Sequence, residues 1–169
     1  MFEFPEEQPF SFETLYGSRS AFTTLKTPER VEVYRITPTV LVEPERGIKT
    51  ILGHQLLSGP VVPPKATRSE FIALFSARDT FYDRPLCGRE PGVLLRASSH
   101  GVTVDLLFCF KCRDVVIIRN DKHIALCYPG RDDLAGIQVG MTKASTRKFL
   151  RIFQLLFPND KELQNVKIE

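Results

Sequence analysis

The sequence has little of what marks several specialised classes of protein. Its four cysteines in 169 residues are too sparse for a disulfide scaffold, and no stretch approaches the ~20 apolar residues of a membrane-spanning helix. The formal net charge is only +3, well below the dense basic field of a typical nucleic-acid binder. Neither nucleic acid nor a membrane is therefore favoured as a partner.

Motifs of common catalytic sites are also missing. The chain has no Gly-rich phosphate loop, no dinucleotide fingerprint and no His-x-x-x-His zinc helix. No nucleophile motif surrounds a cysteine, and His100 lies in an expected turn and His123 beside one, where solvated side chains are commoner than general bases. The acidic start at Met1 lacks the positive n-region of a signal peptide. We therefore expect a non-enzymatic, cytoplasmic protein.

The composition is that of an ordinary globular protein. Hydrophobic residues make up 43% of the chain and charged residues 25%, and a domain of this size buries roughly 70% of its unfolded surface. The sequence contains no internal repeat, low-complexity tract or long linker. We expect a single domain over residues 1–169, in which residues 1–10 are irregular.

Strand patterns dominate the middle of the chain. Alternation of apolar and polar residues predicts a strand over residues 30–36. From Gly92 onward, apolar segments at 92–97, 102–109, 115–118 and 123–128 are separated by turn-forming residues at 98–101 and 119–122. These segments predict an antiparallel meander over residues 92–128.

Helical patterns flank the strands. A weak pattern over residues 11–25 is interrupted by Gly17. Thr67 and Glu70 have the spacing of a capping box, which predicts a helix over about 68–78. Apolar residues three and four apart predict a second helix over about 142–157, which Pro158 ends. The expected fold is α+β, with a mostly antiparallel sheet packed against the last two helices.

The second of these helices collects four cations opposite its apolar side, namely Lys143, Arg147, Lys148 and Arg151. A basic amphipathic helix can lie on anionic lipid or phosphate, but such a face is more often the solvated side of a surface helix. We expect the solvated face.

Three cysteines, Cys87, Cys109 and Cys112, gather around one apolar segment. An unbroken strand over residues 102–119 would be ~55 Å long, so we expect a break at 109–112 or at 113–114. In an extended strand the Cys109 and Cys112 side chains would point to opposite faces. In a tight turn they could share a zinc ion or a disulfide bond.

The pairing of the predicted strands 92–97 and 102–109, the first hairpin, constrains where the cysteines lie. If Ala97 lies opposite Val102, the same register places Cys87 opposite Cys112. Three interpretations stay open: inert reduced thiols, a disulfide or redox pair, and a site for one zinc ion formed by the three cysteines and completed by Cys127 or a histidine.

Asp105 stands among apolar residues in a predicted strand. Because an unpaired carboxylate is costly to bury, we expect it to form a salt bridge, with Arg96 on the neighbouring strand as the candidate partner. A structural ion pair is favoured here over catalysis.

Four segments of the chain carry a family resemblance. They are Arg30-Val-Glu-Val-Tyr-Arg-Ile36, Gly53-His-Gln-Leu-Leu-Ser-Gly59, Cys87 followed by Pro91-Gly92 and Leu95-Arg96, and Val104-Asp-Leu-Leu-Phe-Cys-Phe-Lys-Cys112. Over about residues 30–119 the chain resembles a group of uncharacterised bacterial proteins with a Val-Glu-Val-Tyr strand and a Cys…Asp-Leu-x-x-Cys-Phe-x-Cys string. Members often carry Pro-x-His-Gly where this chain has Glu90-Pro-Gly-Val93. The group has no established activity, so the resemblance supports grouping the cysteines and implies no function.

Two functions remain as expectations. The first is a small soluble module that binds another protein as an accessory, regulatory or immunity component. The second is a metal- or thiol-dependent protein built on Cys87, Cys109 and Cys112.

Overall fold

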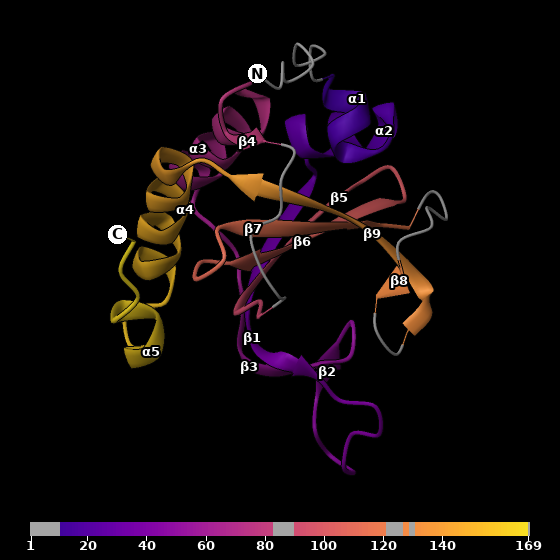
Figure 1. Ribbon diagram of the computed structural model, residues 1–169, viewed down its shortest axis with the longest axis vertical. Helices are drawn as coiled ribbons and strands as arrows, with labels where there is room; N and C mark the ends of the chain where they lie inside the picture. Colours follow the sequence, from indigo (N-terminus) through magenta and orange to yellow (C-terminus); the bar gives the residue numbers. More distant parts are fainter. Residues whose placement is uncertain (1–10, 83–89, 121–126, 129–130, 169) are drawn as a thin grey trace, which may run out of the picture.

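An antiparallel sheet with helices over one of its faces forms the body of the molecule (Figure 1). The computed structural model describes residues 11–82, 90–120, 127–128 and 131–168. The strands are β1 Arg30–Val40, β2 Thr50–Ile51, β3 His54–Val61, β4 Phe81–Tyr82, β5 Val93–Ser99, β6 Val102–Cys109, β7 Asp114–Arg119, β8 Cys127–Tyr128 and β9 Arg131–Met141. The helices are α1 Phe12–Tyr16, α2 Arg19–Lys26, α3 Lys65–Ser76, α4 Lys143–Leu156 and α5 Lys161–Gln164. The α+β fold predicted from the sequence is confirmed.

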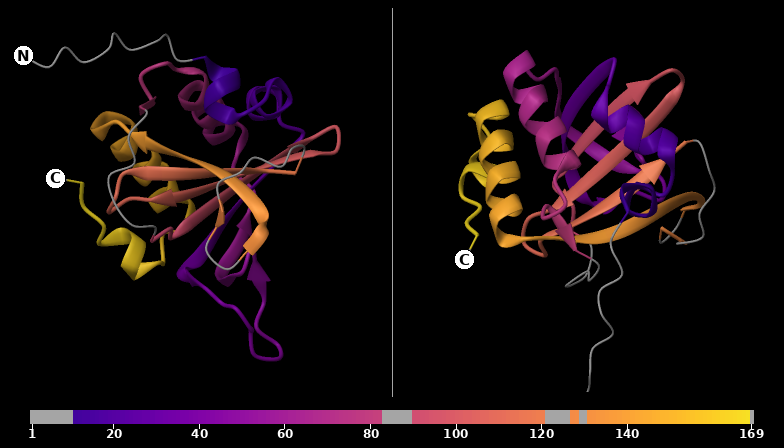
Figure 2. Two further views of the ribbon diagram at one scale, coloured as in Figure 1. Left: turned by 45° about the vertical axis from the view of Figure 1, so that its right-hand side comes forward. Right: turned by 90° about the horizontal axis from the view of Figure 1, so that it is seen from above.

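The strands follow the order β2-β3-β1-β5-β6-β7-β9-β4, and β8 pairs with β9 beside this path. Successive side chains point to opposite faces of the sheet. One face packs with α1–α4 into a single core, and α3 and α4 lie side by side over it in the right-hand view of Figure 2. Phe108 of β6 meets α4 there, with its ring centroid 4.9 Å from that of Phe149 and 5.0 Å from that of Phe153. The other face buries a smaller cluster of Tyr34, Ile36, Leu94, Leu107, Val116 and Ile118.

The helix predicted over 142–157 is confirmed as α4. Thr142 caps it by accepting the N–H of Ser145 at 3.2 Å. The weak pattern over 11–25 becomes α1 and α2, and Gly17 ends α1 with a φ of 77° that other residues rarely adopt.

The predicted capping box is wrong. Helix α3 begins at Lys65, so Thr67 lies inside its first turn and makes no cap. Pro64 occupies the N-cap with a φ of −56° and has no N–H to satisfy, which lets the helix start directly after it. The helix accordingly runs over 65–76 instead of 68–78.

The predicted meander holds for β5, β6 and β7, with a different turn in the first hairpin. Ser99 pairs with Val102, so the turn has only two residues, His100 and Gly101, with φ of 49° and 77°. Such turns match the twist of the flanking strands. Ala97 therefore pairs with Val104, and the register that placed Cys87 opposite Cys112 is wrong by two residues.

The fourth strand of the meander is not the predicted one. Strand β7 pairs with β9, and Cys127–Tyr128 of the predicted 123–128 strand pairs with β9 as well. Residues 121–126 lie outside the described part of the chain, as do residues 1–10, which we predicted to be irregular. The glycines Gly136 and Gly140 within β9 have low strand propensity, which hid this strand in the sequence.

No helix within the described ranges is both long enough and apolar enough to cross a membrane.

Candidate binding pocket

A cavity of about 780 Å³ lies beside the C-terminal segment of the chain. Its walls come from the end of β1, residues 90–93, the β6–β7 turn, the first residue of α4, and α5 with the following tail. Apolar side chains line part of it, namely Ile36, Val93, Phe110, Leu163, Val166 and Ile168. Its charged lining consists of Arg35, Glu90, Lys111, Arg113, Lys143, Glu162 and Lys167. We call this cavity the basic pocket.

The β6–β7 turn, residues 110–113, forms one wall of the basic pocket. Strand β6 ends at Cys109, whose Sγ accepts the N–H of Cys112 at 3.4 Å. Arg113 then adopts a positive φ of 53°, and β7 starts at Asp114, directly opposite Cys109. The predicted break therefore falls within the cysteine string, and the tight turn places Phe110, Lys111 and Arg113 in the pocket lining.

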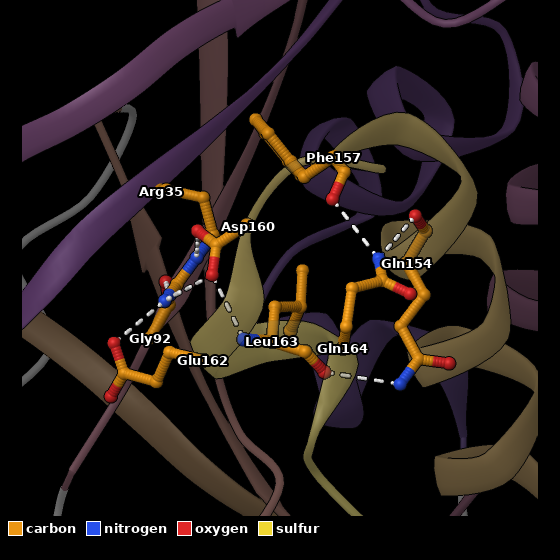
Figure 3. A network of polar contacts seen from close by, with 8 residues as sticks. All are labelled: Arg35, Gly92, Gln154, Phe157, Asp160, Glu162, Leu163 and Gln164. Carbon is orange, nitrogen blue, oxygen red and sulfur yellow. Dashed lines mark hydrogen bonds and ion pairs between the residues drawn. The ribbon is translucent and has the colours of Figure 1, made fainter.

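The buried side chain of Arg35 holds α5 against β1 (Figure 3). Its Nε donates to Asp160 Oδ2 at 2.6 Å, its Nη2 lies 3.2 Å from Glu162 Oε2, and its Nη1 donates to the Gly92 carbonyl. Asp160 also caps α5 by accepting the Leu163 N–H at 2.8 Å. Burial favours a higher pKa for Asp160, but the hydrogen bonds from Arg35 and Leu163 outweigh it and lower that pKa.

Two glutamines fasten α5 to the end of α4 (Figure 3). Gln154 Nε2 donates to the Leu163 carbonyl at 3.0 Å, and Gln164 Nε2 donates to the carbonyls of Gln154 and Phe157 at 2.8 and 3.0 Å. The wall of the pocket formed by α5 is thus held by polar contacts to two different elements.

The acidic side chains of the pocket are already paired. Lys111 Nζ lies 3.2 Å from Glu90, and Glu162 pairs with Arg35. Within the described part of the chain, Arg113, Lys143 and Lys167 form no ion pair. Among the described residues the pocket therefore presents three cations without an acidic partner.

The structure brings two of the three predicted cysteines together. Cys109 is a buried free thiol. Burial raises its pKa, while the backbone N–H groups of Cys112 and Glu90 act in the opposite direction. Cys112 takes part in a disulfide bond, and the side chains of the other two cysteines, Cys87 and Cys127, lie outside the described residues.

A metal site is not formed by the described side chains. Among them, no three His, Cys, Asp or Glu residues are placed to hold one ion. Because Cys87 is not described, the predicted zinc site of Cys87, Cys109 and Cys112 stays a prediction.

The histidines lie away from the basic pocket. His54 is buried with Nδ1 2.7 Å from the Thr37 carbonyl oxygen, and burial lowers its pKa. His100 is 87% exposed in its turn, as expected for a solvated residue. Its Nδ1 lies 2.8 Å from Ser99 Oγ, and its Nε2 lies 3.6 Å from Glu29 Oε1. Because the side chains of His100 and Glu29 are both exposed, water screens their interaction. His123 lies outside the described residues.

Sequence reasoning missed the basic pocket. Its lining comes from five elements that are distant in the chain, and no local spacing connects them. The one available signal lies after Pro158, where the apolar residues Leu163, Val166 and Ile168 follow the end of the predicted helix at intervals of three and two residues.

Comparison of the chain with protein-family models, with curated proteins and with solved structures finds no match. The resemblance to the bacterial group with the cysteine string therefore stays a prediction. The pocket itself is the basis for inferring a function.

Proposed function

We propose that this protein is a non-enzymatic module that binds a segment of another protein in the basic pocket. The observation that carries the proposal is an apolar lining combined, in one cavity, with three cations that no described acidic residue pairs. Binding sites typically combine a mostly apolar surface with a few polar groups that fix orientation, in cavities of about 300–1,000 Å³. The basic pocket has this size and this combination.

The lining favours binding over catalysis. The described lining residues include no histidine, cysteine, serine or threonine, which are the usual nucleophiles and the commonest general base. Its two carboxylates, Glu90 and Glu162, are engaged by Lys111 and Arg35. A set of nucleophile, base and orienting group is therefore not assembled there.

The wall formed by the tail favours a peptide segment as the ligand. Leu163 of α5 is buried, while Val166 and Ile168 are half-buried and extend the apolar lining along the chain. A row of this kind offers contact to successive side chains of an extended partner segment, as in other peptide-binding grooves. An accessory, regulatory or immunity component would use such a site.

Selection from a random peptide library on the full-length chain tests the proposal. Selected peptides should bind wild type and lose at least about tenfold in affinity with Val166→Asp, which places a charge in the apolar lining. Val42→Asp is the matched control, because Val42 is 83% exposed and lies outside the pocket lining. Equal binding to Val166→Asp would exclude the pocket as the site, and a folded protein that selects no peptide would contradict the function.

The β6–β7 turn supports a second proposal, a metal- or thiol-dependent role for Cys87, Cys109 and Cys112. The supporting observation is the Cys112 N–H donated to Cys109 Sγ within a tight turn. Backbone N–H groups directed at a sulfur favour its thiolate form, and at Cys109 burial outweighs them and raises the pKa of the thiol. Zinc content and thiol counts, described below, test this role.

A further inference from the structure

Three cations in the basic pocket are left without a described acidic partner. Arg113 belongs to the β6–β7 turn, Lys143 is the first residue of α4, and Lys167 belongs to the tail. They come from three separate elements and share one cavity. Buried Arg35 differs from them, because Asp160, Glu162 and the Gly92 carbonyl already satisfy its guanidinium group.

The described lining of the basic pocket carries an excess of positive charge. It contains five of the 23 lysines and arginines of the chain and two of its 20 acidic residues. The described lining therefore has three more basic than acidic residues. A charge this localised creates an electrostatic potential that attracts an anionic ligand.

Local folding does not require these cations. Lys143 lies in the first turn of α4, where the helix dipole disfavours positive charge. Arg113 adopts a left-handed φ of 53°, which glycine or asparagine would adopt at lower cost. Neither residue is the best choice for its backbone position, so local folding does not account for the charge of Arg113 or Lys143.

We infer that the basic pocket recognises an acidic peptide segment, an inference that rests on the proposed function. The carboxylates of the segment pair with Arg113, Lys143 and Lys167, and its apolar side chains pack against Phe110, Val166 and the neighbouring lining. Because Lys143 and Lys167 are exposed, each ion pair is screened by water and salt, and affinity depends on the charges acting together with apolar contact.

Fluorescent peptides of matched length test the charge preference. Each carries the same Leu and Phe residues, with Glu, Gln or Lys at the remaining positions, and binding is followed by anisotropy at about 50 and 300 mM NaCl. The Glu peptide should bind at least about tenfold more tightly than the Gln peptide and weaken as salt rises. Equal binding of the Gln or Lys peptide would overturn the inference.

Substitutions that spare the fold identify the residues responsible. Arg113→Gly removes the charge and suits the positive φ, and Lys143→Gln and Lys167→Gln remove charge from exposed positions. Each should weaken the Glu peptide about fivefold with an unchanged melting temperature. Arg147→Gln is the matched control, because Arg147 is exposed on α4 and lies outside the lining. An equal loss with Arg147→Gln would overturn the assignment to the pocket.

The outcomes separate this inference from the proposed function. If the Gln peptide binds as well as the Glu peptide and Val166→Asp abolishes both, the protein-binding function stands and the acidic preference is wrong. If no peptide binds but citrate does so in a manner sensitive to Arg113→Gly, the pocket takes a small anion and the protein-binding function is wrong. A phosphopeptide that binds tenfold more tightly than the Glu peptide would overturn the choice of carboxylate.

Discussion

Arg96 and Asp105 face each other across β5 and β6 and form two hydrogen bonds, of 2.7 Å from Nε and 2.9 Å from Nη2. The two side chains are buried to different degrees, with 31% of Arg96 but only 7% of Asp105 exposed. Burial raises the pKa of Asp105, and the hydrogen bonds from Arg96 act in the opposite direction. The carboxylate therefore depends on its partner more than the guanidinium does.

This asymmetry predicts unequal costs of removing either partner. Arg96→Ala leaves a buried carboxylate unpaired and should cost about 3–5 kcal/mol. Asp105→Ala leaves a cation that water reaches and should cost less, about 1–3 kcal/mol. Urea unfolding near pH 7 measures both, and equal costs would show that the two groups are equally dependent on the pair.

The cost of Arg96→Ala should also depend on pH. Without Arg96, burial alone acts on Asp105 and places its folded pKa above its unfolded value of about 3.9. The folded state then binds the proton more readily, so the penalty decreases as pH falls through the folded pKa and grows as pH rises. The same substitution measured near pH 4 should therefore be milder than near pH 7.

Asp160 predicts the opposite trend in wild type, because its contribution to the free energy of unfolding decreases as the pH falls. The hydrogen bonds from Arg35 and Leu163 lower its pKa in the folded state, so the unfolded chain binds the proton first as the solution becomes more acid. The stabilisation is full above the unfolded pKa of about 3.9 and is lost as pH falls through the folded pKa. Asp160→Asn should reduce the loss of unfolding free energy between about pH 5 and pH 2.5. Glu43→Gln removes an exposed carboxylate and should leave that loss unchanged.

The burial of Phe153 predicts how much the docking of α4 contributes to the free energy of unfolding. Its side chain is fully buried, and the centroid of its ring lies 5.4 Å from that of Phe71 and 5.0 Å from that of Phe108. Phe153→Ala should lower the free energy of unfolding by about 3–5 kcal/mol. Leu155→Ala, at a position that is 72% exposed, should change it by less than about 0.5 kcal/mol. A cost below about 1 kcal/mol for Phe153→Ala would contradict the docking of α4.

Features that depend on neighbours in sequence were predictable. Helix α4 follows from apolar spacing and its limits from Thr142 and Pro158. The Arg96–Asp105 pair follows from the high cost of burying one carboxylate between two predicted strands. In each case a single strong energetic term acts over a few residues.

Features set by tertiary context were not predictable. Strand β9 is stabilised by pairing with β7 despite Gly136 and Gly140, because pairing on the sheet can outweigh low propensity. The register of the first hairpin depends on the length of its turn, predicted from the sequence as four residues, 98–101, whereas the structure has the two-residue turn His100-Gly101. The basic pocket is lined by five segments that are distant in the sequence, and no sequence pattern indicates that they lie together.

A count of free thiols decides between the three interpretations of the cysteines that the sequence left open. Because Cys112 takes part in a disulfide bond, two of the four thiols should be missing from a titration of the unfolded, unreduced protein and should return after reduction. Cys109, which is free and buried, should react with an alkylating agent only slowly in the folded state. A disulfide is rare in the cytosol, so this count also tests the expectation of a cytoplasmic protein.

A zinc site at Cys87, Cys109 and Cys112 predicts a different result. The purified protein should then contain about one equivalent of zinc by elemental analysis, and a chelator should lower its stability, because metal binding energy contributes directly to folding. All four thiols should titrate after chelation without a reductant. Four free thiols together with no metal would leave the cysteines inert and contradict both the disulfide and the thiol-dependent proposal. Zinc at one equivalent would establish a metal-stabilised fold, and a catalytic role would further require an open coordination position.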